Sequence, residues 1–148
     1  MKTVFFIPGK PLSKGNVRSF QVKGRTIYVD GNKALKSWEA VAKMILQDYA
    51  PDELWDGAVA MELTFFFQEP KATPKGKKGK IPMTKKPDST KIARSVEDTM
   101  TGIIFRDDSQ ITDYHIRKRY GEKPGVLVRI WQVDGLNDAF SHAWSQAW

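Results

Sequence analysis

The residues best suited to chemistry in this chain are carboxylates placed on either side of one predicted helix. The segment KKPDSTKIARSVEDTMTGIIFRDDSQI spans residues 85–111, with Asp88 ahead of the helix and Asp107 and Asp108 in the turn after it. Each group also has an ordinary structural role. Asp88 follows a proline and can cap the helix, and the two later aspartates can form a turn. A chain that folds back across a strand end would instead bring the carboxylates close together.

Carboxylates gathered beside basic side chains have the composition of a site for a divalent cation and a phosphodiester. Hard cations such as Mg²⁺ take oxygen ligands, and phosphodiester hydrolysis needs a metal to activate water and to stabilise charge on the leaving oxygen. The chain has no cysteine and only two histidines, which lie far apart in the sequence, so no nitrogen or sulfur metal site competes. The basic neighbours of the carboxylates are Lys85, Lys86, Arg94 and Arg106.

Length and composition predict one domain with an anionic partner. With 148 residues, 41% of them hydrophobic, the chain can bury one substantial core. No N-terminal apolar segment or 18-residue apolar run indicates a signal peptide or a membrane span, so we expect a soluble, cytoplasmic protein. The net charge of +7 favours nucleic acid as the partner.

Residues 71–86 form a lysine loop, rich in proline and glycine and poor in apolar side chains. We predict a mobile basic loop that neutralises DNA phosphates, which would make binding fall steeply with salt. The alternative is a solvated insertion that only aids solubility. The lysines of this loop are Lys71, Lys75, Lys77, Lys78, Lys80, Lys85 and Lys86.

Hydrophobic periodicity predicts the elements that must position these residues. In chain order they are strands at 3–7 and 26–29, a helix at 33–49, a strand at 59–67, a helix that ends at Gly102, and strands at 111–120 and 126–133. The last two strands are predicted to form a hairpin through residues 121–125. This order predicts an α+β (α/β) fold in which two helices pack on one face of a small mixed sheet.

The C-terminal segment, residues 134–148, differs in kind from the domain at residues 1–133. Phe140, Trp144 and Trp148 recur at four-residue steps, so a short helix there would present one aromatic face. Such a face packs on the protein's own core or on a second subunit, or it docks another protein.

Several blocks of this chain occur together in the order and spacing of a known nuclease family. The blocks are Phe6–Pro11 with Lys14 and Arg18, then Lys86–Asp88, a helix, and Asp107–Ile111. They resemble the RusA family of Holliday-junction resolvases over residues 3–133. The resemblance implies a homodimer that uses Mg²⁺, with Mn²⁺ as a substitute, to make paired symmetric nicks in four-way DNA junctions during recombination and repair. A two-fold dimer presents two equivalent sites to the two equivalent strands of a junction.

The chain departs from the family pattern at the family's second aspartate, where it has Thr90. The family asparagine falls on Lys91 and the family lysine on Arg94. Asp88 and Asp108 carry over as metal ligands and catalytic residues. Arg94, or Lys91 turned inward, would stabilise the developing negative charge.

Loss of one carboxylate should weaken Mg²⁺ binding unless another replaces it. Glu97 lies seven positions after Thr90, on nearly the same helix face and roughly 10.5 Å along the axis. We expect Glu97 to be the third ligand. Asp98 is the alternative, although an ion pair with Arg94 would explain it equally well. Asp107 is expected to be a neighbour of the metal site.

The expected DNA-contacting residues are Lys14, Arg18, Lys85, Lys86 and Arg106, together with the lysine loop. Phosphate contacts of this kind select backbone and junction shape and carry little base information. Two rival hypotheses remain open. One is a catalytically weak or inactive protein that binds branched DNA, motivated by Thr90. The other is a basic RNA- or DNA-binding module in which the aspartates serve only as caps and turns.

Overall fold

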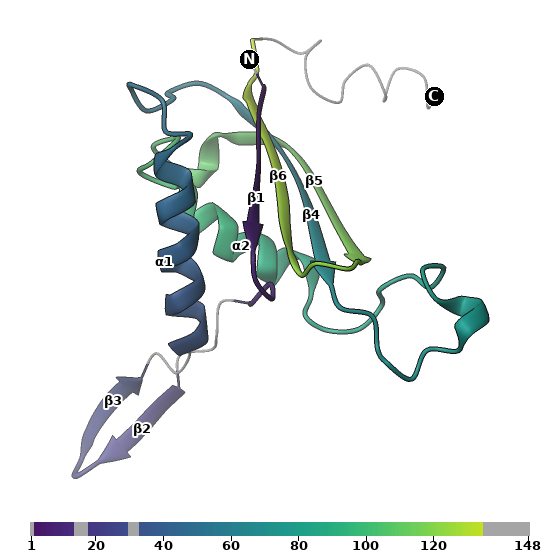
Figure 1. Ribbon diagram of the computed structural model, residues 1–148. Helices are drawn as coiled ribbons and strands as arrows, with labels where there is room; N and C mark the ends of the chain where they lie inside the picture. The colour runs from purple at the N-terminus through teal and green to yellow at the C-terminus, as the bar shows by residue number, and fades with distance from the viewer. Residues whose placement is uncertain (1, 14–17, 30–32, 135–148) are drawn as a thin grey trace.

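The computed structural model describes residues 2–13, 18–29 and 33–134 of the chain (Figure 1). Lys14 and the aromatic segment at 135–148 lie outside the described residues, so the prediction of an aromatic helix face remains a prediction. The elements in chain order are β1 (Lys2–Pro8), β2 (Arg18–Val22), β3 (Arg25–Val29), α1 (Lys33–Gln47), β4 (Val59–Phe67), the 3-10 helix η1 (Lys75–Lys77), α2 (Ser89–Met100), the 3-10 helix η2 (Asp108–Gln110), β5 (Ile111–Tyr120) and β6 (Gly125–Gln132).

Four strands form a mixed sheet in the order β1-β6-β4-β5. β6 runs antiparallel to both β1 and β4, whereas β5 runs parallel to β4. Parallel neighbours need a crossover connection, and α2 supplies it between β4 and β5. Both long helices lie on the same side of the sheet (Figure 1). The predicted α+β fold, with a mixed sheet and two helices, is confirmed.

The predicted hairpin between the last two strands is wrong, because β4 lies between β5 and β6. β4 has buried side chains on both faces over its first three residues and alternates afterwards, so it needs a partner strand on each side. β5 is rich in charged and polar residues and occupies the sheet edge. Residues 121–124 therefore cross the end of β4, a span of about 10 Å for strands two places apart. A hydrogen bond from Gly121 N to the Phe67 carbonyl, of 2.9 Å, fixes this crossing.

The strand β2 was not predicted from the sequence. It pairs with β3 in a two-stranded sheet. This sheet projects away from the main sheet, near the start of α1 (Figure 1). The turn between them is Lys23–Gly24, and both residues have positive φ, of 49° and 74°. Two-residue turns of this kind favour a hairpin, so the glycine after a β-type run was a usable signal.

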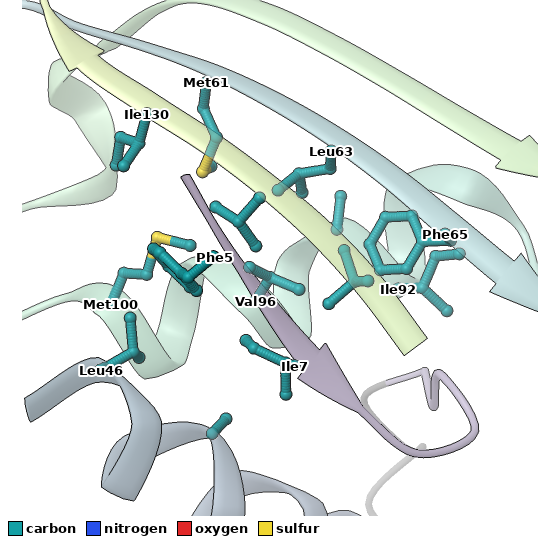
Figure 2. Packing of buried hydrophobic residues seen from close by; sticks show 14 of the residues in the cluster. Phe5, Ile7, Leu46, Met61, Leu63, Phe65, Ile92, Val96, Met100 and Ile130 are labelled. Atoms are coloured by element: carbon teal, nitrogen blue, oxygen red, sulfur yellow. The ribbon is translucent and has the colours of Figure 1, made fainter. Parts of the chain in front are cut away.

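The core lies between the sheet and the two helices (Figure 2). α1 buries the apolar stripe expected of it, and it ends at Gln47, two residues before the predicted Tyr49. Tyr49 stacks on Phe5 with 4.9 Å between ring centroids. α2 ends as predicted, with Gly102 in the left-handed region at φ 84°. The core residues labelled in Figure 2 are Phe5, Ile7, Leu46, Met61, Leu63, Phe65, Ile92, Val96, Met100 and Ile130.

Close packing between β1 and β6 predicts that Gly125 tolerates no side chain. An added Cβ would lie 2.6 Å from the Ile7 carbonyl oxygen and would also overlap the Phe6 ring. We expect Gly125→Ala to lower the free energy of unfolding by about 1–3 kcal/mol or more, because backbone cannot move aside cheaply. Gly76→Ala is the matched control, since a Cβ there meets nothing within 4 Å. Urea denaturation of both variants tests this, and equal midpoints would contradict it.

Candidate active site

The start of α2 and the turn after it lie at opposite ends of that helix. Asp88 precedes the first residue of α2, and Asp108 begins η2, beyond the C-terminal end of the helix. β5 then returns beside α2. Its Tyr114 faces Glu97 on the last turns of the helix, whereas its Lys118 contacts the chain just before the helix starts. The predicted site residues therefore fall into two groups along α2.

Glu97 and Asp108 form the first group. Burial raises the pKa of the Glu97 carboxyl above its ordinary value of 4.5, and the negative charges of Asp108 and Asp98 raise this pKa further. The Tyr114 hydroxyl and the Arg94 guanidinium lower the pKa of Glu97, which partly offsets this rise. The half-buried Glu97 carboxylate is thus repelled by the Asp108 carboxylate.

Tyr114 completes this group from β5. Its hydroxyl oxygen is buried and lies close enough to interact with the Glu97 carboxylate, but it has no hydrogen bond of regular geometry. Burial, together with the charges of Glu97 and Asp108, raises the pKa of Tyr114 far above its ordinary value, so the phenol remains a neutral donor. Sequence reasoning missed Tyr114, because only the β4–α2–β5 crossover brings it to the helix.

This arrangement fits a divalent cation in its chemistry. Two mutually repelling carboxylates would be stabilised by a positive charge, and hard cations prefer such oxygen donors. Within the part of the chain that the structure describes, no group of three or more acidic, histidine or cysteine side chains is arranged to hold a metal. The fit is therefore that of a two-carboxylate site, to which substrate phosphates or water would add ligands.

Asp88 stands apart from that pair. It precedes Glu97 by nine residues, about 13.5 Å along a helix, which is more than two carboxylates can bridge to one ion. Asp88 occupies the N-cap position, but its side chain makes no capping hydrogen bond. Its carboxylate oxygen lies 3.6 Å from Lys91 Nζ, and both side chains are more than half exposed. The carboxylate is therefore available to bind a ligand, since surface ion pairs of this kind are weak.

Asp107 has a structural role in this structure. Its carboxylate accepts a hydrogen bond of 2.8 Å from Ser109 N and caps η2. That hydrogen bond is the main reason that the pKa of Asp107 lies below its ordinary value of 3.8. The turn role weighed from the sequence thus describes Asp107. The negative charge of the neighbouring Asp108 instead acts on Glu97 and raises its pKa.

Gln110 fixes the turn that carries Asp108. Its Oε1 accepts hydrogen bonds from the backbone nitrogens of Arg106 and Asp107, at 2.9 and 2.8 Å. Its Nε2 donates to the carbonyls of Trp55 and Gly57, at 2.8 and 2.9 Å. The four bonds tie η2 to the segment that precedes β4. The glutamine of the DDSQ block was a usable signal, because an amide can satisfy donors and acceptors at once.

The second group surrounds the start of α2. Lys85 and Lys86 are exposed, and Lys118 Nζ donates to the carbonyls of Lys85 and Pro87 at 2.7 and 2.9 Å. Lys118 therefore holds the segment that leads into Asp88 against β5. Sequence reasoning missed Lys118 as well.

The remaining basic residues predicted to contact DNA are dispersed. Arg106 pairs with Asp56, and both side chains are mostly exposed. Arg18 is the first residue of β2, in the projecting hairpin. Arg94 is exposed on α2, six residues after Asp88 and three before Glu97, between the two groups. Lys14 lies outside the described residues.

Besides the hydrogen bond from Lys118 to the Lys85 carbonyl, the lysine loop has two attachments to the rest of the protein. The Glu69 carboxylate accepts a hydrogen bond from Gly79 N at 3.2 Å, and Met83 is buried in the core. The lysines between these points are exposed, and η1 lies among them. The predicted mobility of this loop remains a prediction.

The different roles of Asp107 and Asp108 predict opposite effects on stability. We expect Asp107→Ala to destabilise the metal-free protein, because it removes the cap of η2. Asp108→Ala should be neutral or stabilising, because it relieves repulsion of Glu97. The Asp107 contribution should be complete above its ordinary pKa of 3.8 and should vanish as pH falls through the lower folded pKa. Urea denaturation between pH 2 and 7 measures this, and equal loss in both variants at pH 7 would disprove the distinction.

Comparison with known proteins agrees with the family resemblance of the sequence blocks. The chain is 28% identical over 136 residues to an uncharacterized protein, YqaN, of Bacillus subtilis strain 168, and the match covers 87% of this chain and 95% of YqaN. The family model described as endodeoxyribonuclease RusA matches residues 8–131, from the last residue of β1 through α2 and the DDSQ turn to the next-to-last residue of β6. The chain therefore belongs to the RusA family of endodeoxyribonucleases.

Proposed function

We propose that the protein is a Mg²⁺-dependent, structure-specific endodeoxyribonuclease that resolves four-way DNA junctions by paired symmetric nicks, in DNA recombination and repair. The observation that carries the proposal is the Glu97–Asp108 pair, in which a half-buried carboxylate faces a second carboxylate and a buried hydroxyl. This pair would supply a cation site in a chain of a nuclease family, at whose position 90 the family resemblance expects an aspartate and this sequence has Thr90.

Glu97 and Asp108 would hold Mg²⁺ at one end of α2, with the Tyr114 hydroxyl orienting the Glu97 carboxylate. Asp88 would hold an ion at the other end once DNA brings a phosphate, since Mg²⁺ is commonly bound by one or two carboxylates plus substrate phosphates. When bound, these Mg²⁺ ions, or Mn²⁺ as a substitute, would activate water and stabilise the leaving oxygen.

Cations along α2 would bind the phosphates. Arg94, exposed between the two groups, can grip a phosphate in bidentate fashion and carries a permanent charge for the transition state. Lys91 can contribute a second cation when it releases Asp88. Phosphate contacts by Lys85 and Lys86 position the strand without reading its sequence.

A homodimer is part of the proposal, because paired nicks on opposite strands need two equivalent sites. The net charge of +7 suits the phosphate backbone of branched DNA. Among the described helices, none combines the length and apolarity needed to cross a lipid bilayer.

A catalytically weak or inactive protein that binds branched DNA is the second candidate. It is favoured by Thr90 and by the fact that the described carboxylates form no three-ligand group. The two candidates agree on binding and differ only in the chemical step.

The proposal predicts Mg²⁺-dependent cleavage of a labelled four-way junction. Asp108→Asn should reduce the cleavage rate by about 100-fold or more, because metal stabilisation of the transition state is worth several kcal/mol. Mapped products on denaturing gels should be paired and symmetric, and a linear duplex should remain intact. Tight junction binding without nicks in Mg²⁺ or Mn²⁺ would support the inactive binder instead.

The two groups along α2 predict different effects on metal binding. Without DNA, Glu97→Gln should raise the Mg²⁺ concentration that half-saturates a thermal shift, by about 10-fold or more, because one of two charged ligands is lost. Asp88→Asn should leave that concentration unchanged, although it should abolish junction cleavage. Glu53→Gln, an exposed glutamate elsewhere, is the control for charge. If Asp88→Asn and Glu97→Gln raised the Mg²⁺ requirement equally, the two-group arrangement would be wrong.

A further inference from the structure

A pocket lies next to the segment that carries Asp88. Its volume is about 320 Å³, and it is bounded by residues from four separate parts of the chain. The residues that matter for its chemistry are Lys10, Phe67, Met83, Lys85, Lys86 and Tyr120. None of the proposed metal ligands lines it.

The pocket combines cations with an apolar floor. Phe67 and Met83 are 6% and 8% exposed and form that floor, while Lys10, Lys85 and Lys86 are exposed around it. None of the described residues that line the pocket is acidic. Its chemistry therefore suits a ligand with both a negative charge and a flat apolar surface, which is the description of a nucleotide.

Backbone hydrogen bonds fix the pocket walls. Gly9 N, beside Lys10, donates to the Pro124 carbonyl at 3.1 Å. Gly121 N, beside Tyr120, donates to the Phe67 carbonyl at 2.9 Å. Lys118 holds the Lys85 carbonyl in place. The walls are thus formed before any ligand binds, which is usual for small-ligand sites.

Size and position indicate one nucleotide rather than a duplex. Ligand pockets usually enclose about 300–1,000 Å³, so this one lies at the small end. Lys86 precedes Asp88 by two residues, at most about 7 Å of chain. We propose that the pocket receives one unstacked nucleotide of the DNA strand, with its phosphate against the lysines and its base against the Tyr120 ring. The proposal rests on the proposed function in one respect, namely that the neighbouring phosphate of the strand lies at Asp88.

Branched DNA makes such a nucleotide available. Moving a base out of a duplex is least unfavourable where pairing or stacking is already interrupted, as it is at a junction. Stacking on an aromatic ring tolerates any base, so the pocket would favour branch points without requiring one sequence.

The test uses a short single-stranded oligonucleotide with one central 2-aminopurine, in EDTA, so that neither metal binding nor junction cleavage affects the result. Stacking quenches 2-aminopurine fluorescence, and we expect the wild-type protein and Tyr120→Phe to quench it on binding. Tyr120→Leu should lose the quenching and bind at least about fivefold more weakly, because each aromatic stacking contact is worth that much or more. Melting temperatures verify that the Leu variant is folded.

The lysine wall has its own readout. Lys86→Ala should reduce the slope of log Kd against log salt by about 0.7, the value for one phosphate contact to a single strand. Lys43→Ala removes the same charge from an exposed position on α1 and should leave the slope unchanged. Equal quenching by wild type and Tyr120→Leu, or no binding of the oligonucleotide by the wild type, would overturn the pocket proposal even if the protein cleaves four-way junctions. Failure of cleavage alone would reject the proposed function and leave the pocket intact.

Discussion

Burial of β4, which extends to both faces over its first three residues and to one face after them, is the constraint on which the rest of the structure depends. A strand this apolar favours the interior of a sheet, and β5 and β6 flank it. Because β5 is parallel to β4, a helix must connect them, and α2 is that helix. The crossover then sets β5 beside α2, with Tyr114 level with Glu97 and Lys118 level with the residues before Asp88. The chemistry of this chain is arranged along α2 because β4 is buried.

The same constraint explains what the sequence could predict and what it could not. Periodicity identified α2, its start after Pro87 and its end at Gly102, because those signals lie within a few residues of one another. The pairing of β5 with β4 involves residues some 50 positions apart, for example Leu63 opposite Ile116, and short-range turn rules favoured the incorrect hairpin. The hairpin β2–β3 was a different kind of failure, since its Lys23–Gly24 turn is a local signal that was overlooked.

The candidate site divides in the same way. Helical spacing could place Glu97 on α2, but it could not show that Tyr114 and Asp108 would surround it, because both lie beyond the helix. Spacing also predicted that Glu97 shares an ion with Asp88, which the length of α2 opposes. The neighbouring aspartates Asp107 and Asp108 have different roles. Asp107 caps η2, whereas Asp108 faces Glu97, and the amide of Gln110 holds both of them in place.

In the proposed function, the residues along α2 have two opposed electrostatic requirements. Metal binding needs carboxylates close together, and DNA binding needs cations, yet intimate ion pairs between them would neutralise both. α2 meets both needs by separation along its length. At one end the half-buried Glu97 carboxylate feels the negative charge of the exposed Asp108, and burial of Glu97 would strengthen its interaction with a cation. At the other end Lys85, Lys86 and Lys91 are exposed to solvent, where any attraction for a phosphate chain would be screened by salt and reversible. A carboxylate at Glu97 instead of position 90 lies away from these lysines, whereas Asp88 lies 3.6 Å from Lys91. In the proposed function, Glu97 is therefore the ligand whose affinity for a cation the lysines would weaken least.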